Sequence, residues 1–209
     1  MKSYEHIEEL RTLYEERQEA IRKRLEEFSA IKPGEYFYEL VYCLLTPQSS
    51  AINAGRAVEA LKAEDLLGRD VECAQILFRK QHYIRFHNTK AKRLAEVKEG
   101  YTGIHAQLCN GSTSPDLRSW LVKNVKGLGW KEASHFLRNI GHRDLAILDR
   151  HILKNLKKHH VIRVVPKTLT PKRYLVIEKK FHRFAQAVGI SIDELDLLFW
   201  SNETGEILK

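Results

Sequence analysis

Apolar positions along the chain repeat with the period of helices rather than with the alternation of strands. The first segment has apolar residues three, four and seven positions apart, which predicts an amphipathic helix that ends before Pro33 and Gly34. Its apolar positions are Ile7, Leu10, Tyr14, Ile21, Leu25 and Phe28. Residues 36–45 are apolar nearly all round, so we expect a helix buried on most faces. It breaks at Thr46-Pro47 and resumes after a serine cap.

The same period predicts helices further along the chain, over residues 63–80, 88–108, 117–125 and 132–140. A polar loop is expected over 110–116, where Ser114 or Asp116 caps the helix that follows, and Gly141 is placed for a left-handed helix end. The β-branched run 161–165 predicts a short strand or a core turn. No alternating run of convincing length is present, so the predicted fold class is all-α.

Positive charge is concentrated in one part of the sequence. The net charge is +8, and residues 126–183 hold 15 Lys and Arg against 4 Asp and Glu, so the remainder of the chain is slightly acidic. A basic region of this kind suits a polyanion such as DNA. The alternative is that these residues only keep the surface soluble.

Other classes of protein are disfavoured by composition. No stretch approaches the roughly 20 apolar residues of a membrane span, and the polar start MKSYEHIEEL suggests neither signal peptide nor anchor. We therefore expect an intracellular protein of the cytoplasm or nucleoid, without a membrane partner. Cys43, Cys73 and Cys109 form no C-x-x-C pair, so we expect no iron-sulfur or zinc site, no other metal and no cofactor.

The most informative motif is KGLGWK, residues 126–131, between two predicted helices. Gly127 and Gly129 allow a tight turn with backbone angles that side chains forbid. With Lys126 beside them, the turn amides and the start of the next helix can bind a DNA phosphate. An ordinary turn between two helices is the alternative.

The longer segment KGLGWKEASHFLRNIGHRDLAILDRHIL resembles the hairpin and catalytic segment of the helix-hairpin-helix glycosylases. Lys131 and Asp149, 18 residues apart, match the spacing of that superfamily, with Asp149 in LDRHI. The sequence GWKEASHFLRN is similar to that of the second family of 8-oxoguanine DNA glycosylases, found in archaea and some bacteria. The resemblance extends from FYELVYCLLTPQS to WSNETGEILK.

This resemblance implies a two-lobed helical fold with the active site in the groove between the lobes. It would be one glycosylase unit over 1–209, with the helix-hairpin-helix motif at about 117–140. The basic lobe is expected at about 70–183, and the N-terminal and C-terminal helices are expected to form the second lobe.

The resemblance also implies a bifunctional glycosylase and lyase. The Lys131 amine would attack C1′ of the damaged nucleotide, form a Schiff base and promote β-elimination; a helix start inside a basic region favours the neutral amine that this attack needs. Asp149 would stabilise the positive charge that develops at C1′ and assist proton transfer. From the residues alone, a helix N-cap is the stronger explanation of Asp149, and both roles are compatible.

Four further residues are candidates for reaching and reading the base, which such an enzyme must extrude from the duplex. Gln48 matches the position of a wedge that fills the gap, or is a solvated side chain beside a helix break. By resemblance Phe86 and Trp200 sandwich the base, although core packing is the common role of an aromatic. The terminal carboxylate at Lys209 is a candidate acceptor for the N7–H that distinguishes 8-oxoguanine from guanine.

The expected partner is double-stranded DNA containing 8-oxoguanine, bound by a monomer. Two alternatives remain open. A glycosylase for oxidised pyrimidines usually carries a four-cysteine cluster near its C-terminus, whereas here the last cysteine is Cys109. A non-catalytic hairpin module would need the glycine turn and the basic region but neither Lys131 nor Asp149.

Overall fold

The computed structural model describes residues 4–207, and these residues form ten α-helices, two short 3-10 helices and no strand. The predicted all-α class is therefore confirmed. The chain divides into two units: unit 1 comprises the described residues of Met1–Ala30 and Leu137–Lys209, and unit 2 comprises Ile31–Phe136. The basic stretch 126–183 is shared by both units. The lobe expected at about 70–183 is a statement about charge and stays a prediction.

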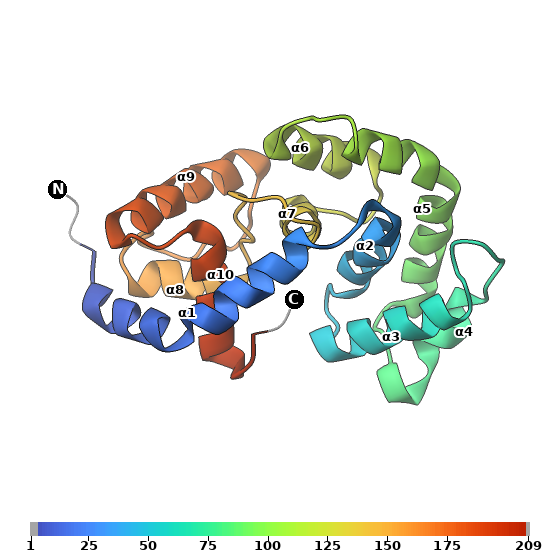
Figure 1. The fold of residues 1–209 in the computed structure, drawn as a ribbon, viewed down its shortest axis with the longest axis horizontal. Helices are drawn as coiled ribbons and strands as arrows, with labels where there is room; N and C mark the ends of the chain where they lie inside the picture. Colours follow the sequence, from blue (N-terminus) through green and yellow to red (C-terminus); the bar gives the residue numbers. More distant parts are fainter. Residues whose placement is uncertain (1–3, 208–209) are drawn as a thin grey trace. The chain divides into compact units, whose positions relative to one another are not determined.

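Unit 1 contains the helices α1 (Ile7–Ser29), α8 (Arg150–Lys158), α9 (Pro171–Val188) and α10 (Ile192–Thr204). Figure 1 shows α1 in blue crossing α10 in red, and α8 also packs on α10. The predicted apolar stripe of α1 is buried at Leu10, Tyr14, Ile21, Leu25 and Phe28, as expected for an amphipathic helix. The helix packs against α10, where Leu195, Leu198 and Phe199 are also buried.

Unit 1 contains a buried ion pair. Arg138 donates from Nη1 to Oδ2 of Asp196 at 2.8 Å, and the two side chains are 3% and 11% exposed. The Arg138 guanidinium also lies 4.7 Å from the ring centroid of Phe28. One arginine therefore links the end of the hairpin segment to both α1 and α10.

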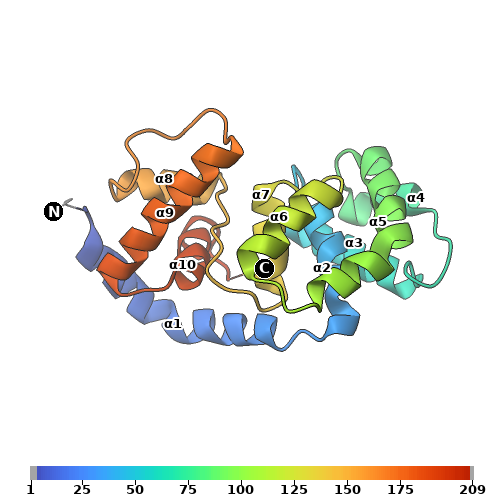
Figure 2. The same ribbon diagram turned by 90° about the horizontal axis from the view of Figure 1, so that it is seen from above.

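Unit 2 contains α2 (Tyr36–Leu45), α3 (Ala51–Ala63), α4 (Cys73–Phe78), α5 (His87–Leu108), α6 (Ser114–Asn124) and the first part of α7 (Trp130–Asn139). The 3-10 helices at Pro33–Glu35 and Lys80–His82 also belong to it. Figure 2 shows α2, α3, α4 and α5 gathered together, in agreement with their contacts. Arg118 joins α6 to α7, because its guanidinium lies 4.8 Å from the Trp130 ring and donates to Ser134 Oγ at 3.2 Å.

Two predicted helix breaks are confirmed. The chain leaves α2 at Thr46, and the side chain of Ser50 caps α3 by accepting from Asn53 N at 3.1 Å. Gly141 has φ +95, and a Cβ there would lie 3.1 Å from Ser29 Cα. Glycine is therefore required at 141 both by its backbone angle and by close packing.

Two local predictions were wrong. The helix expected over 63–80 is reduced to α4, because Asp65 has a positive φ and its carboxylate accepts from Gly68 N, which makes a turn instead. The cap of α6 is Thr113 rather than Ser114 or Asp116, since Pro115 fits the first helical turn and the helix begins before it. Residues 161–164 form bends, and Val161 and Ile162 are buried, so of the two alternatives expected for 161–165 the core turn is present and the strand is not.

Candidate functional site

The hairpin turn lies between α6 and α7, as predicted. Leu128 N donates to Val125 O at 3.1 Å and closes the turn. Gly127 has φ +101, and a Cβ at this position would lie 2.7 Å from Cδ of Arg93 on α5. Because a side chain would be strained and would also collide with Arg93, Gly127 brings bare backbone to the surface of the turn.

Lys131 is the second residue of α7, and its side chain is about one-third exposed. Its Nζ lies 3.2 Å from Glu132 Oε1, while Glu132 Oε2 accepts from Gly129 N at 3.2 Å. Glu132 therefore connects the lysine to the hairpin turn. Glu132 was not among the site residues predicted from the sequence, although an acidic side chain three positions after a helix cap is a known capping signal.

Asp149 is the N-cap of α8. Its Oδ1 accepts from the backbone N–H groups of His151 and Ile152, both at 2.8 Å, which confirms the structural role expected for it. Both bonds end on Oδ1, so the cap does not use Oδ2. Lys131 lies in unit 2 and Asp149 in unit 1, and their cooperation stays a prediction.

Gln48 is at the tip of the turn between α2 and α3. Ser49 N donates to Thr46 O at 3.0 Å, which leaves Pro47 and Gln48 at the two middle positions. Gln48 is exposed and has φ +57, so its side chain is presented to solvent from a strained backbone. Gln48 therefore has the exposed position that a wedge residue needs.

Phe86 is presented in a similar way from unit 2. It is the N-cap of α5 with φ +60, its side chain is 50% exposed, and the Arg85 guanidinium lies 4.8 Å from its ring centroid. A large aromatic side chain held at the surface is available to stack on a base. Trp200, half-buried on α10, belongs to unit 1, so the predicted sandwich stays a prediction.

Lys126 and Lys209 are the remaining residues predicted from the sequence. Lys126 is exposed and makes a 2.9 Å ion pair with Glu96 of α5, a contact of small energy that DNA phosphate can replace. Lys209 lies outside the described residues.

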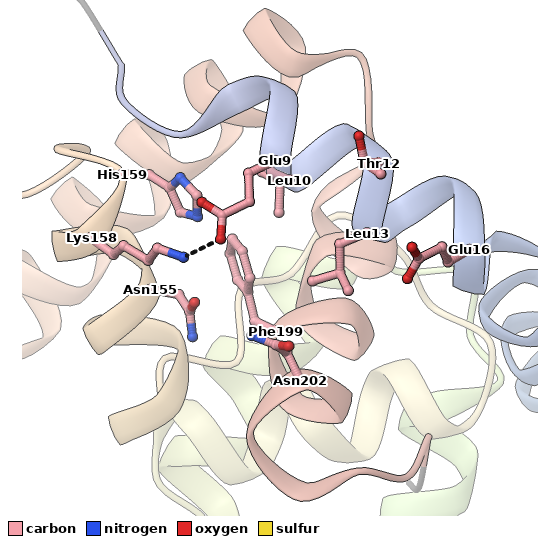
Figure 3. Close-up of a pocket in the computed structure, with 10 residues that line it drawn as sticks. All are labelled: Glu9, Leu10, Thr12, Leu13, Glu16, Asn155, Lys158, His159, Phe199 and Asn202. Atoms are coloured by element: carbon pink, nitrogen blue, oxygen red, sulfur yellow. Dashed lines mark hydrogen bonds and ion pairs between the residues drawn. The ribbon is translucent and has the colours of Figure 1, made fainter.

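A pocket in unit 1 contains none of the predicted site residues. It lies between α1, α8 and α10 and has a volume of about 360 Å³ (Figure 3). Lys158 and Glu9 face each other in this pocket at 3.3 Å, and the Lys158 ammonium lowers the pKa of the Glu9 carboxyl. The pocket therefore shares no lining residue with the predicted site.

Within residues 4–207, no helix is both long enough and apolar enough to cross a bilayer.

Comparison with known proteins covers nearly the whole chain. A family model described as 8-oxoguanine DNA glycosylase matches residues 21–190. The 8-oxoguanine DNA glycosylase/AP lyase of Fusobacterium nucleatum is 43% identical, with all of both chains covered, and the protein of the same name from Korarchaeum cryptofilum is 40% identical over 91% of each. A crystal structure of the Methanocaldococcus jannaschii 8-oxoguanine glycosylase/lyase with a 15mer DNA containing 8-oxoguanine has a TM-score of 0.88, at 33% identity over 97% of this chain and 99% of that one.

Proposed function

The chain belongs to the helix-hairpin-helix family of 8-oxoguanine DNA glycosylases, and on that premise we propose that it removes 8-oxoguanine from double-stranded DNA and then nicks the strand. The main support for assigning this reaction to Lys131 is its position. Lys131 lies at the start of α7, directly after a glycine turn suited to a DNA phosphate. We further propose that the enzyme acts as a monomer on intracellular DNA.

Lys131 is the proposed nucleophile. Its neutral amine attacks C1′ of the damaged nucleotide, the bond from C1′ to N9 breaks, and the base leaves with the bonding electron pair and takes up a proton. The amine loses a proton, and opening of the sugar ring gives a Schiff base. Loss of a C2′ proton then expels the 3′ phosphate, and water releases Lys131. In the free protein the amine is paired with Glu132, so that contact has to open before attack.

Asp149 is the proposed carboxylate partner. Its negative charge favours the oxocarbenium-like character that develops at C1′, and it assists proton transfer to and from the amine. Because Oδ1 is held by two backbone N–H groups, the carboxylate is rigid while Oδ2 remains for this purpose. A fixed charge stabilises a transition state without the cost of reorganisation.

Substrate contacts follow from the same premise. Gly127 and Gly129 provide the turn that receives a phosphate, with Lys126 beside it, and Gln48 fills the space of the extruded nucleotide. Phe86 and Trp200 are proposed to stack on the base. The Lys209 carboxylate is proposed to accept from its N7–H, so that deletion of Lys209 weakens the preference over guanine without changing stability.

The test uses duplexes that carry 8-oxoguanine, guanine or an oxidised pyrimidine at one position, with separate detection of free base and nicked strand. We expect release and nicking on 8-oxoguanine only, and neither product from the Lys131→Gln variant. Preferred release of the pyrimidine would identify the other glycosylase class, and DNA binding without any product would identify a binding module.

A further inference from the structure

Lys90 is a fully buried charged residue that the proposed chemistry does not use. Its side chain lies on α5 with 2% of its surface exposed, and Nζ donates to Leu45 O and Pro47 O, both at 2.7 Å, and to Ser49 Oγ at 3.3 Å. The three donors of the ammonium thus meet three oxygens of the turn that carries Gln48. Burial, with a smaller effect of Arg93, lowers the pKa of Lys90 to about 8, so the ammonium form still predominates at neutral pH.

Ser49 joins this turn to a second segment. Its Oγ receives both Lys90 Nζ and the backbone N–H of Arg85, the latter at 3.1 Å. Arg85 directly precedes Phe86, whose carbonyl in turn accepts from the backbone N–H of Lys90 at 3.0 Å. One lysine and one serine therefore tie together the two short segments that present Gln48 and Phe86.

Both presented residues have a strained backbone. Gln48 and Phe86 have φ +57 and +60, in the left-handed region that non-glycine residues enter only at an energetic cost. Such angles persist only when surrounding contacts impose them. The bonds of Lys90 and Ser49 are those contacts, because they fix the carbonyls on one side of Gln48 and the amide before Phe86.

α5 supports the hairpin as well. Arg93 follows Lys90 by three residues, hence on the same face of the helix, and its side chain lies against Gly127. The first turns of α5 therefore contact the Gln48 turn, the Phe86 segment and the hairpin. These three parts of unit 2 are the ones that the proposed function assigns to DNA.

We propose that Lys90 is a positioning residue for extrusion of the damaged nucleotide, which, through Ser49, fixes Gln48 and Phe86 in the orientation that the DNA meets. This inference rests on the proposed function. Lys90 touches neither the base nor the sugar in this role. It acts by holding a preformed surface, so that little ordering is left to be done when the DNA binds.

The test compares Lys90→Met, which keeps the length of the side chain without its charge, with Ser49→Ala, which removes only the link between the two segments. Lys92→Met, at an exposed position of the same helix, and Ser119→Ala, on α6, are the matched controls. Excision of 8-oxoguanine is measured under single-turnover conditions from a duplex and from the same strand alone. Extrusion and gap filling are needed only in the duplex.

We expect Lys90→Met and Ser49→Ala to slow excision from the duplex by about 10-fold to 100-fold, and excision from the single strand less, because there only the stacking on Phe86 is disturbed. Adding Lys90→Met to a Gln48→Ala, Phe86→Ala double variant should cost little more than that double variant alone, because Lys90 acts through these two residues. Parallel losses on both substrates that follow the melting temperature would overturn the inference, as would additive effects with the Gln48→Ala, Phe86→Ala double variant. Ser49→Ala keeps the test decisive if Lys90→Met does not fold.

Hydrogen exchange of the free protein separates this inference from the proposed function. Lys90→Met and Ser49→Ala should speed exchange at residues 46–50 and 83–87, and the controls should not. If the two variants exchange faster but the wild-type protein excises no 8-oxoguanine, the proposed function is contradicted and the role of Lys90 in holding the two segments is not. Normal excision with unchanged exchange contradicts the role of Lys90.

Discussion

The double role of Asp149 is testable because two substitutions separate its charge from its cap. Asp149→Asn keeps an oxygen that can accept from the backbone N–H groups of His151 and Ile152, whereas Asp149→Ala removes both bonds. Losing an N-cap costs about 1 kcal/mol. In a chain of this size that lowers the melting temperature by about 2 to 4 °C. Asparagine should lose only a few tenths of a kcal/mol, from the weaker interaction with the helix dipole.

Catalysis should follow a different order. Both variants lose the negative charge proposed to act at C1′, so both should excise 8-oxoguanine at least about 100-fold more slowly than the wild type. The assays are thermal melting, single-turnover excision and binding of lesion DNA, which Asp149→Asn should retain. Full activity of Asp149→Asn would refute the catalytic role and leave Asp149 as a cap only.

Three further predictions concern stability, pH and salt. Arg138→Met removes the guanidinium from a buried ion pair and should cost about 3 kcal/mol or more in the free energy of unfolding; a change below about 0.5 kcal/mol in denaturant melts would contradict this. His159 stacks on Phe184 and Phe199, and burial lowers the pKa of its imidazole. As the pH drops, the unfolded state therefore takes up a proton at His159 before the native state does. The free energy of unfolding should fall below about pH 6.5, the ordinary pKa of histidine. His159→Phe should therefore show a smaller drop in melting temperature between pH 7 and pH 5, and an unchanged drop would count against the assignment. Lys126→Ala should reduce the magnitude of the slope of log affinity for DNA against log salt concentration by about 1, while Lys23→Ala should leave it unchanged. Equal slopes for Lys126→Ala and the wild type would show that Lys126 makes no phosphate contact.

Periodicity was a good guide where one apolar face decides the structure. The stripe of α1 and the hairpin helices follow it, and Gly127 and Gly141 occur where the backbone angle disfavours a side chain. At Gly141 the backbone of Ser29 also crowds the position. The cap at Asp149 was likewise predictable, because a carboxylate before a helix has few other local uses. Prediction failed between α3 and α4, where the turn around Asp65 ends an apolar pattern.

Residues whose partners are distant in sequence were harder to find. Lys90 lies among other basic residues at the start of α5, and its acceptors are carbonyls more than 40 residues earlier. One signal was present: Lys90 is four residues before Leu94 and so falls on the buried stripe of that helix. A charged residue on an apolar face needs a polar partner, but its identity requires the three-dimensional structure.

The central claim is that the Lys131 amine forms the covalent bond to the damaged nucleotide. The direct measurement is borohydride reduction of the enzyme with 8-oxoguanine duplex, followed by mass spectrometry of the nuclease-trimmed and proteolysed adduct. We predict a single modified peptide with the sugar remnant on Lys131, and no adduct from Lys131→Gln. A modification on another lysine, or an adduct that survives Lys131→Gln, would contradict the account.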